Sequence, residues 1–434
     1  MIAVAFTGPL AELTSSARAA ILQRALPDAE ARVADSVRRV IERVRAEGDD
    51  ALVAFTKDFD RVELRALEVS RSEMARAVGG LDPSIVRALE RAKRNLETVH
   101  RAFLPARTEV EVEPGVLVGR RPDPLAAVGV YAPGGRAAYP SSVLMGVVPA
   151  RVAGVRDIVV CSPPGPNGLP SDVVLAAAAI AGATRVFAIG GAQAVAALAF
   201  GTATVPKVDR IVGPGNAYVA EAKRQVAGSV GIDAPAGPSE ILVIADEGAD
   251  PEHLAREMLA QAEHDPDASC VALVVGDDLA SRVARALAAS EPEKREVVAA
   301  ALGSRGAILS IRSLDEAWPF AAAYAAEHLL LAVRDPASVL DRVLHAGTVF
   351  YGDGSSVAFG DYMTGGNHVL PTAGAARSFS GLSTQDFVRW TTYQRVDRAA
   401  AATMAGDVAL LARAEGLPAH AAAAAAFTEE GARR

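Results

Sequence analysis

One stretch of sequence decides the fold of this chain, namely residues 127–161, AVGVYAPGGRAAYPSSVLMGVVPARVAGVRDIVVC. Two short apolar runs, Ala127 to Tyr131 and Asp157 to Cys161, are rich in Val and Ile, as buried strands are. Between them a Pro-Gly-Gly turn leads into a helical pattern near Val143 to Ala153. A strand, a helix and a second strand of these lengths predict a βαβ unit and therefore a parallel sheet.

The alternation of helices and strands continues on both sides of a break at Pro235-Ala236-Gly237-Pro238-Ser239. Apolar positions recur at helical spacing through most of the first hundred residues, and the tail from Thr384 is Ala-rich and predicted to be helical. A helix over 314–326 is expected to end where the apolar strand Leu329 to Val333 begins. The pattern predicts an α/β protein with two doubly wound α/β domains and helical N- and C-terminal extensions.

Composition excludes several classes of function. The net charge is -8, and no run of five like charges occurs, so a nucleic-acid groove or an anionic membrane surface is not expected. The longest apolar run, Val173 to Ala181, is far shorter than a membrane span, and the start of the chain does not resemble a signal peptide. Cys161 and Cys270 lie far apart in apolar surroundings, which indicates buried thiols. We expect a cytoplasmic protein.

Three glycine-rich turns follow predicted strands and open towards helices: Tyr131-Ala132-Pro133-Gly134-Gly135, Gly190-Gly191-Ala192-Gln193 and Gly213-Pro214-Gly215-Asn216. Such turns line the carboxyl edge of a parallel sheet, where ligands bind and helix N-termini attract phosphate. None has the G-x-G-x-x-G pattern of dinucleotide sites, and each alone could be an ordinary turn. Together, on one sheet edge, they make a nucleotide-sized ligand as good an interpretation as three ordinary turns.

Four residues offer nitrogen and oxygen donors of the kind that zinc accepts: Gln261, His264, Asp361 and His420. Gln261 and His264 lie near the end of one predicted helix, whose dipole there favours a cation. Taken alone, however, a polar helix end is commonplace. Sequence spacing does not bring the four residues together.

Glu327 and His328 are candidates for acid–base chemistry, because a charged pair beside an apolar strand is unfavourable unless it is used or paired. Histidine has a pKa suited to a base near neutral pH, and the neighbouring carboxylate could activate water. The alternative is that both side chains are hydrogen-bonded at the end of a helix and have no catalytic role. His100, His253 and His345 lie beside charged residues and are expected at the surface.

Taken together, these motifs resemble the histidinol dehydrogenase family, in family order from about residue 30 to the end. The motifs that carry the resemblance are Tyr139 to Met145, Gly190 to Ala194, Gly213 to Asn216, Ile232 to Glu240, Gln261 to Pro266, Glu327 to Leu329, Asn367 to Thr372 and Glu415 to Leu417. The resemblance implies NAD-dependent oxidation of L-histidinol through the aldehyde to L-histidine, the last steps of histidine biosynthesis.

The resemblance also implies roles for single residues. One zinc ion per subunit would be held by Gln261, His264, Asp361 and His420. The histidinol pocket would be lined by these ligands together with Ser239, His328 and Glu415. NAD would contact Tyr131, Gln193 and Asn216. His328 would take the hydroxyl proton, and Glu327 would activate water for the second oxidation.

The implied organisation has an N-terminal arm at 1–25 and a discontinuous zinc and catalytic domain at 26–130 with 237–381. A Rossmann-like NAD-binding domain would occupy 131–236, and the helical tail at 382–434 would complete the active site of a partner in a homodimer. His420 lies in this Ala-rich tail, which has few large side chains and needs a surface to bury against. The alternative is that the tail folds back onto its own subunit.

The chain departs from the family pattern at three places. Ala326 stands where the family usually has Pro, and Gly366 stands where it usually has Pro or Thr. Ser356-Val357 replaces a Pro-Glu pair. None of these changes removes a proposed ligand or base. A related dehydrogenase acting on another polar alcohol, such as a sulfonated diol, and a non-catalytic metabolite-binding protein are the remaining alternatives.

Overall fold

The structure, a computed structural model, describes residues 2–24, 31–134, 138–234, 237–352 and 354–431. Gly135 of the first glycine-rich turn and Pro235-Ala236 of the predicted break lie outside the described residues. The chain forms two compact units. The first consists of Met1–Phe103 with Leu125–Phe387, and the second of Leu104–Pro124 with Val388–Arg434.

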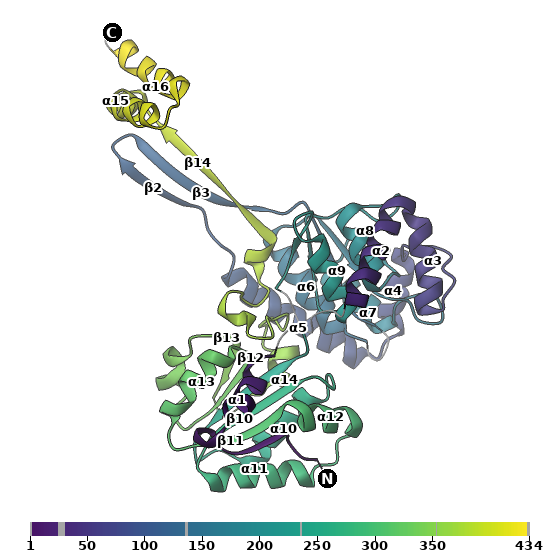
Figure 1. Ribbon diagram of the computed structural model, residues 1–434. Helices are drawn as coiled ribbons and strands as arrows, with labels where there is room; N and C mark the ends of the chain where they lie inside the picture. The colour runs from purple at the N-terminus through teal and green to yellow at the C-terminus, as the bar shows by residue number, and fades with distance from the viewer. Residues whose placement is uncertain (1, 25–30, 135–137, 235–236, 353, 432–434) are drawn as a thin grey trace. The chain divides into compact units, whose positions relative to one another are not determined.

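The first unit contains a five-stranded parallel sheet in the order β6-β5-β4-β7-β8, and the helices around it are drawn in purple and teal in Figure 1. Its strands are β4 Ala127–Tyr131, β5 Asp157–Cys161, β6 Arg185–Phe187, β7 Arg210–Val212 and β8 Gly231–Ile232. The chain runs outward from β4 through β5 and β6, and then returns to the other side of β4 with β7. The order therefore reverses between β4 and β7, which is where open parallel sheets bind ligands. The parallel sheet predicted from residues 127–161 is confirmed.

Helices cover this sheet. Those that connect its strands are α6 Pro140–Ala153, α7 Asp172–Ala181, α8 Gly191–Phe200 and α9 Ala217–Val226. Four N-terminal helices precede them: α2 Ala31–Glu47, α3 Asp49–Asp60, α4 Arg71–Gly80 and α5 Pro83–Ala102. Helix α2 packs on α8 and α9, α4 packs on α7, and α5 packs on α6.

The packing of these N-terminal helices differs from the expected grouping of 26–130 with 237–381. The apolar stripe of α2, with Val37, Val40 and Val44, shares one core with Val195 and Leu198 of α8. Helical periodicity identifies the buried face of a helix, but it does not say which sheet that face covers.

A six-stranded parallel sheet in the order β1-β11-β10-β9-β12-β13 forms the other half of the first unit. Its strands are β1 Phe6–Pro9, β9 Glu240–Ala245, β10 Ser269–Val275, β11 Gly306–Ile311, β12 Ala326–Ala332 and β13 Ala346–Tyr351. The N-terminal arm thus supplies an edge strand. The order reverses between β9 and β12.

Both faces of the six-stranded sheet are covered by helices, because alternate residues of each strand point to opposite sides. Ile241 and Val243 of β9 lie in one core with three helices, and Leu242 and Ile244 lie in a second core with two others. The first group is α10 Pro251–Ala262, α11 Asp277–Ala289 and α12 Arg295–Arg305, and the second is α1 Ser15–Leu22 and α13 Ala317–Tyr324. The expected mixed α/β fold with parallel sheets is confirmed.

The junction before the catalytic candidates differs from the prediction. Helix α13 ends at Tyr324, Ala325 adopts a left-handed conformation with φ 49°, and β12 begins at Ala326. Glu327 and His328 therefore lie inside a strand and not at a helix end. The left-handed residue breaks the helix earlier than apolar periodicity indicates.

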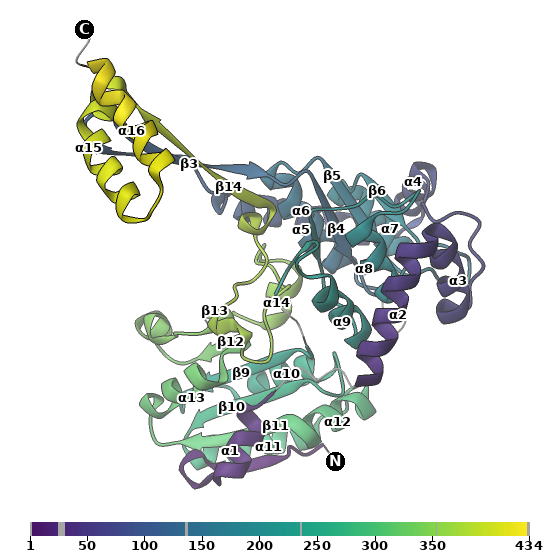
Figure 2. The same cartoon turned by 45° about the horizontal axis from the view of Figure 1, so that its top comes forward.

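The second unit is an antiparallel three-stranded sheet followed by two helices, which lie side by side (Figure 2). The strands, in the order β14-β3-β2, are β2 Thr108–Glu113, β3 Val116–Pro124 and β14 Val388–Val396, and the helices are α15 Arg398–Ala414 and α16 Pro418–Gly431. The prediction of a purely helical tail is wrong for β14. Its sequence, VRWTTYQRV, is rich in the β-branched and aromatic residues that favour strands.

His100 on α5 is buried, contrary to the expected surface position. The side chain is 1% exposed, and neither ring nitrogen has a hydrogen-bond partner among the described residues. Burial lowers the pKa of His100 to about 4. The charged residues beside His100 in the sequence therefore do not indicate whether its ring is buried. No described helix has the length and apolar character that crossing a membrane requires.

Acid should destabilise the first unit through His100. The folded pKa lies below the ordinary value, so protonation favours the unfolded chain and stability is fully present only above about pH 6.5. Between about pH 6.5 and 4, this group should lower the free energy of unfolding by up to about 3 kcal/mol. Urea titrations across this range check the prediction: His100→Leu should flatten the pH dependence, and an unchanged slope would contradict it.

Candidate active site

Glu327 and His328 lie at the amino end of β12, where this strand pairs with β9. Both side chains are buried, at 5% and 4% exposed, and Oε2 of Glu327 lies 3.5 Å from Nδ1 of His328. The backbone N–H of Glu240, the first residue of β9, donates a 2.7 Å hydrogen bond to Oε2 of Glu327. The structure therefore brings the two predicted catalytic residues together and ties them to one neighbouring residue.

The ring of His328 has a defined orientation. Its Nδ1 lies 3.0 Å from the backbone oxygen of Glu240, and because a carbonyl only accepts, Nδ1 carries the proton. The other nitrogen, Nε2, is buried and has no hydrogen-bond partner among the described residues. In the neutral ring, Nε2 is then the atom with a free lone pair.

Asp361 faces this nitrogen. The residue belongs to helix α14, Val357–Tyr362, and its Oδ1 lies 3.6 Å from Nε2 of His328. Burial favours the neutral form of Asp361, but His328, His368 and His264 outweigh burial and hold its pKa below the ordinary value. Burial likewise opposes a charge on His328, yet Glu327 and Asp361 raise the pKa of this imidazole to about 10. The two neighbouring carboxyl groups thus favour the protonated form of this imidazole.

Gln261 and His264 lie at the C-terminal end of α10. Gln261 is 2% exposed, and its side-chain oxygen is buried without a hydrogen-bond partner among the described residues. An unpartnered buried amide oxygen is unfavourable unless something binds it. Together with the carboxylate of Asp361 and the imidazole of His264, whose charge acts on Asp361, it offers oxygen and nitrogen atoms of the kinds that zinc accepts.

The described residues contain no cluster of three or more His, Cys, Asp or Glu side chains that could hold a metal. Of the four predicted ligands, only His264 and Asp361 are residues of these types in the first unit. Gln261 is an amide, and His420 belongs to the second unit.

His368, to which sequence analysis assigns no role, lies against Asp361. Its Nδ1 lies 2.9 Å from the backbone oxygen of Asp361, and burial lowers its pKa. The charge of Asp361 raises the pKa of His368, whereas His328 and His264 lower it. The motif Asn367-His368 could have indicated a role, but nothing in the spacing connects it to residue 328.

Two of the three residues expected to bind NAD are joined through one turn. Tyr131, at the end of β4, accepts a 3.1 Å hydrogen bond from the backbone N–H of Gly191 through its hydroxyl. Burial raises the pKa of Tyr131 to about 12, so the phenol stays neutral. Gln193, in the first turn of α8, is 1% exposed, and its side-chain oxygen has no partner among the described residues.

The third residue, Asn216, follows β7 and caps helix α9. Its side-chain oxygen accepts hydrogen bonds from the backbone N–H groups of Tyr218 and Val219, at 3.0 and 3.1 Å. Gly213 of the same turn has φ 114°, and a Cβ there would lie 2.1 Å from the backbone oxygen of Tyr131. Only glycine allows the turns after β4 and β7 to approach so closely. They meet where the strand order reverses.

The remaining predicted residues are placed as follows. Ser239 directly precedes β9, and its backbone oxygen accepts a 3.0 Å hydrogen bond from Ser269. Glu415 ends α15 and His420 lies in the first turn of α16, both in the second unit and both exposed. Within the first unit, the predicted residues form one group at the amino end of β9 and β12 and another at the carboxyl end of β4 and β7.

Comparison with known proteins identifies the family of this chain. A sequence model of the family described as histidinol dehydrogenase matches residues 23–427 of the chain. The chain belongs to the histidinol dehydrogenase family. It is thus an oxidoreductase.

Relatives in this family match over nearly the whole chain. Histidinol dehydrogenase of Natronomonas pharaonis is 49% identical over 415 residues, covering 95% of this chain and 97% of its own. The Methanosarcina barkeri enzyme is 46% identical over 391 residues, covering 90% of each chain. The crystal structure of histidinol dehydrogenase from Elizabethkingia anophelis superposes with a TM-score of 0.93 at 34% identity, covering 98% of both chains.

The largest departure from the histidinol dehydrogenase pattern, Ser356-Val357, has a structural explanation. Val357 is 3% exposed and packs in a core of the six-stranded sheet. Its backbone N–H donates a 2.9 Å hydrogen bond to the buried carboxylate of Glu257 on α10. The side chain at this position thus serves packing, and the start of α14 is still held by a bond to α10.

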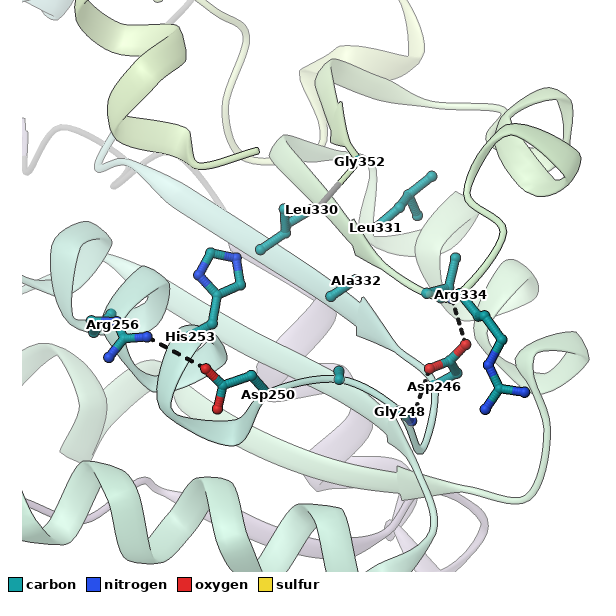
Figure 3. A pocket seen from close by; sticks show the side chains of 12 residues that line it. Asp246, Gly248, Asp250, His253, Arg256, Leu330, Leu331, Ala332, Arg334 and Gly352 are labelled. Carbon is teal, nitrogen blue, oxygen red and sulfur yellow. Dashed lines mark hydrogen bonds and ion pairs between the residues drawn. The ribbon is translucent and has the colours of Figure 1, made fainter. Parts of the chain in front are cut away.

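A pocket of about 420 Å³ lies at the other end of the same strands. Figure 3 shows His253 of α10 beside Leu330 of β12, and Arg256 paired with Asp250 at the start of the same helix. The lining of the pocket contains none of the predicted site residues, and Glu327 and His328 lie at the opposite end of β12. The predicted site residues of this sheet thus lie at its amino edge, away from this pocket.

Proposed function

We propose that this chain oxidises L-histidinol through L-histidinal to L-histidine with two molecules of NAD, as the last steps of histidine biosynthesis. The observation that carries the proposal is the buried pair Glu327 and His328, with an unpartnered Nε2 beside Asp361, in a chain of this family. A binding protein needs no such base.

A zinc ion would be held by Gln261, His264 and Asp361, with His420 as the fourth ligand. The unpartnered oxygen of Gln261 and the depressed pKa of Asp361 support this set. When bound, the ion supplies a Lewis acid that holds nitrogen atoms of histidinol and orients the carbinol carbon.

His328 acts as the general base for the alcohol. Its Nδ1–H bond to Glu240 fixes the ring, so Nε2 takes the hydroxyl proton as hydride leaves the carbinol carbon for NAD. A base must be neutral, whereas Glu327 and Asp361 hold the pKa of His328 near 10 without a cation. A dication bound to Asp361 would cancel much of that attraction and would return the pKa of His328 towards neutrality.

Glu327 acts in the second oxidation. Burial raises its pKa, which makes its carboxylate a stronger base than an exposed one. It removes a proton from the water that adds to the aldehyde, and the hydrate then loses a second hydride to NAD. Retention of the aldehyde between the steps limits the loss of a reactive intermediate.

NAD would bind across the carboxyl ends of β4 and β7, in contact with Tyr131, Gln193 and Asn216. The unpartnered oxygen of Gln193 and the close approach of Gly213 to Tyr131 support this position. We further infer that both parallel sheets are Rossmann-like, because the strand order reverses inside each of them, between β4 and β7 in one and between β9 and β12 in the other.

The second unit would complete the active site of a partner in a homodimer through Glu415 and His420. Large apolar side chains on this unit support an interface: Val110, Val112, Leu410 and Leu411 are 61% to 68% exposed. Solvent-exposed apolar groups in such number favour a protein surface as partner. Two buried free thiols, Cys161 and Cys270, fit a cytoplasmic location.

An NAD-reduction assay tests the function and its closest alternative. We expect L-histidinol to be oxidised with a kcat/KM at least about a hundredfold above that for a sulfonated diol, because a polar pocket rejects a substrate that leaves its groups unpaired. Chelation should abolish the activity and Zn²⁺ should restore it. Preference for the sulfonated diol would assign the chain to the alternative substrate class.

A further inference from the structure

A buried ion pair connects the N-terminal arm to the first residue of β9. The guanidinium of Arg24 donates from Nε to Oε1 of Glu240 at 2.8 Å and from Nη2 to Oε2 at 3.1 Å. Both side chains are 3% exposed. Two parallel bonds between a planar guanidinium and a carboxylate fix position and orientation, which a single contact does not.

Further contacts hold both partners in place. Nη2 of Arg24 also donates to the backbone oxygen of Tyr324 at 2.5 Å, and its guanidinium carbon lies 3.4 Å from the centre of the Tyr324 ring. Oε1 of Glu240 accepts a 2.8 Å hydrogen bond from the backbone N–H of Ala373. The carboxylate of Glu240 is therefore anchored by three donors and has little freedom to shift.

The backbone of Glu240 is the part that contacts the catalytic pair. Its N–H donates to Glu327 at 2.7 Å, and its carbonyl oxygen lies 3.0 Å from Nδ1 of His328. The N–H of Glu240 thus holds Glu327, the proposed water-activating carboxylate, and the carbonyl oxygen of Glu240 holds His328, the proposed base. A shift of Glu240 would move both.

We propose that Arg24 is a positioning residue for the oxidation: by fixing Glu240, it sets the orientation of Glu327 and the tautomer of His328. The inference rests on the proposed function of this pair. Arg24 itself touches neither of them, so its effect passes through Glu240. A misplacement of about 1 Å at a reacting group costs on the order of a hundredfold in rate.

The test is a kinetic double-mutant cycle with Arg24→Met and His328→Asn, measured as NADH formation from L-histidinol. Arg24→Met should lower kcat about 10- to 100-fold with KM changed less than about threefold. In the His328→Asn background the same change should lower kcat less than about twofold, because the base that Arg24 orients is gone and the alcohol step then limits turnover, so that a misplaced Glu327 no longer affects the measured rate. Arg24→Lys, which keeps the charge but not the paired bonds, should give an intermediate loss.

Tyr324→Phe is the matched control in the same buried cluster. It removes the 2.8 Å bond from the Tyr324 hydroxyl to Ser269 but keeps the ring under Arg24 and the backbone oxygen. It should lower the melting temperature without lowering kcat. If Arg24→Met does not fold, Arg24→Lys carries the same cycle.

Equal losses of kcat from the Arg24 variant in both backgrounds would show a merely structural ion pair and overturn the proposal, as would an unchanged kcat with His328 intact. Failure of the proposed function gives a different result. In that case His328→Asn alone would leave oxidation of L-histidinol unchanged.

Discussion

His328→Asn should lower turnover of L-histidinol by about a hundred- to ten-thousand-fold, the usual effect of removing a general base. Asparagine retains a polar side chain but has no lone pair with the basicity of Nε2, which is the buried, unpartnered atom beside Asp361. The proposed ligand set does not include His328, so bound zinc should remain near one per subunit. Steady-state kinetics and metal analysis of the same preparation measure both quantities.

His345→Asn is the control for this variant, because His345 is half-buried in the loop before β13 and outside the proposed site. It should retain full turnover. Near-normal rates in His328→Asn would mean that another group is the base, and loss of zinc in this variant would mean that His328 is a metal ligand.

Mixed subunits should recover activity that neither parent has. When His328→Asn chains exchange with His420→Asn chains, a heterodimer with shared sites has one site with both defects and one intact site. Random exchange makes about half the dimers mixed, so activity should return to about a quarter of the unmodified level from a nearly inactive start. The measurement is NADH formation before and after exchange, with heterodimer content followed by differently tagged chains.

A second mixture provides the control. His328→Asn with Glu327→Gln should recover nothing, because both changes lie on the same subunit's side of the site. Verified exchange of the first pair without any return of activity would mean that the tail serves its own subunit.

The sequence predicted most of the parallel architecture, because buried strands and amphipathic helices leave periodic patterns. It did not predict which sheet the N-terminal helices cover, since the apolar stripe of α2 has the same appearance against either. Ala-rich composition around β14 obscured a nine-residue strand that pairs with β3, more than 260 positions earlier in the chain. Local periodicity does not indicate which distant strands pair.

The candidate site was predictable as a set of residues and not as a geometry. Nothing local to residues 327 and 328 indicates that the backbone of Glu240 holds both, because that contact arises from the pairing of β9 with β12. The position of His368 beside Asp361 likewise follows from the turn after α14. Arg24 lies in a helical arm without any motif, so only the fold shows its bond to Glu240.

The yield of NADH per L-histidinol shows whether one site carries out a four-electron oxidation. With limiting L-histidinol and excess NAD, we expect two NADH and one L-histidine for each substrate molecule, without free aldehyde at any time. One NADH per substrate, with L-histidinal accumulating in solution, would contradict it.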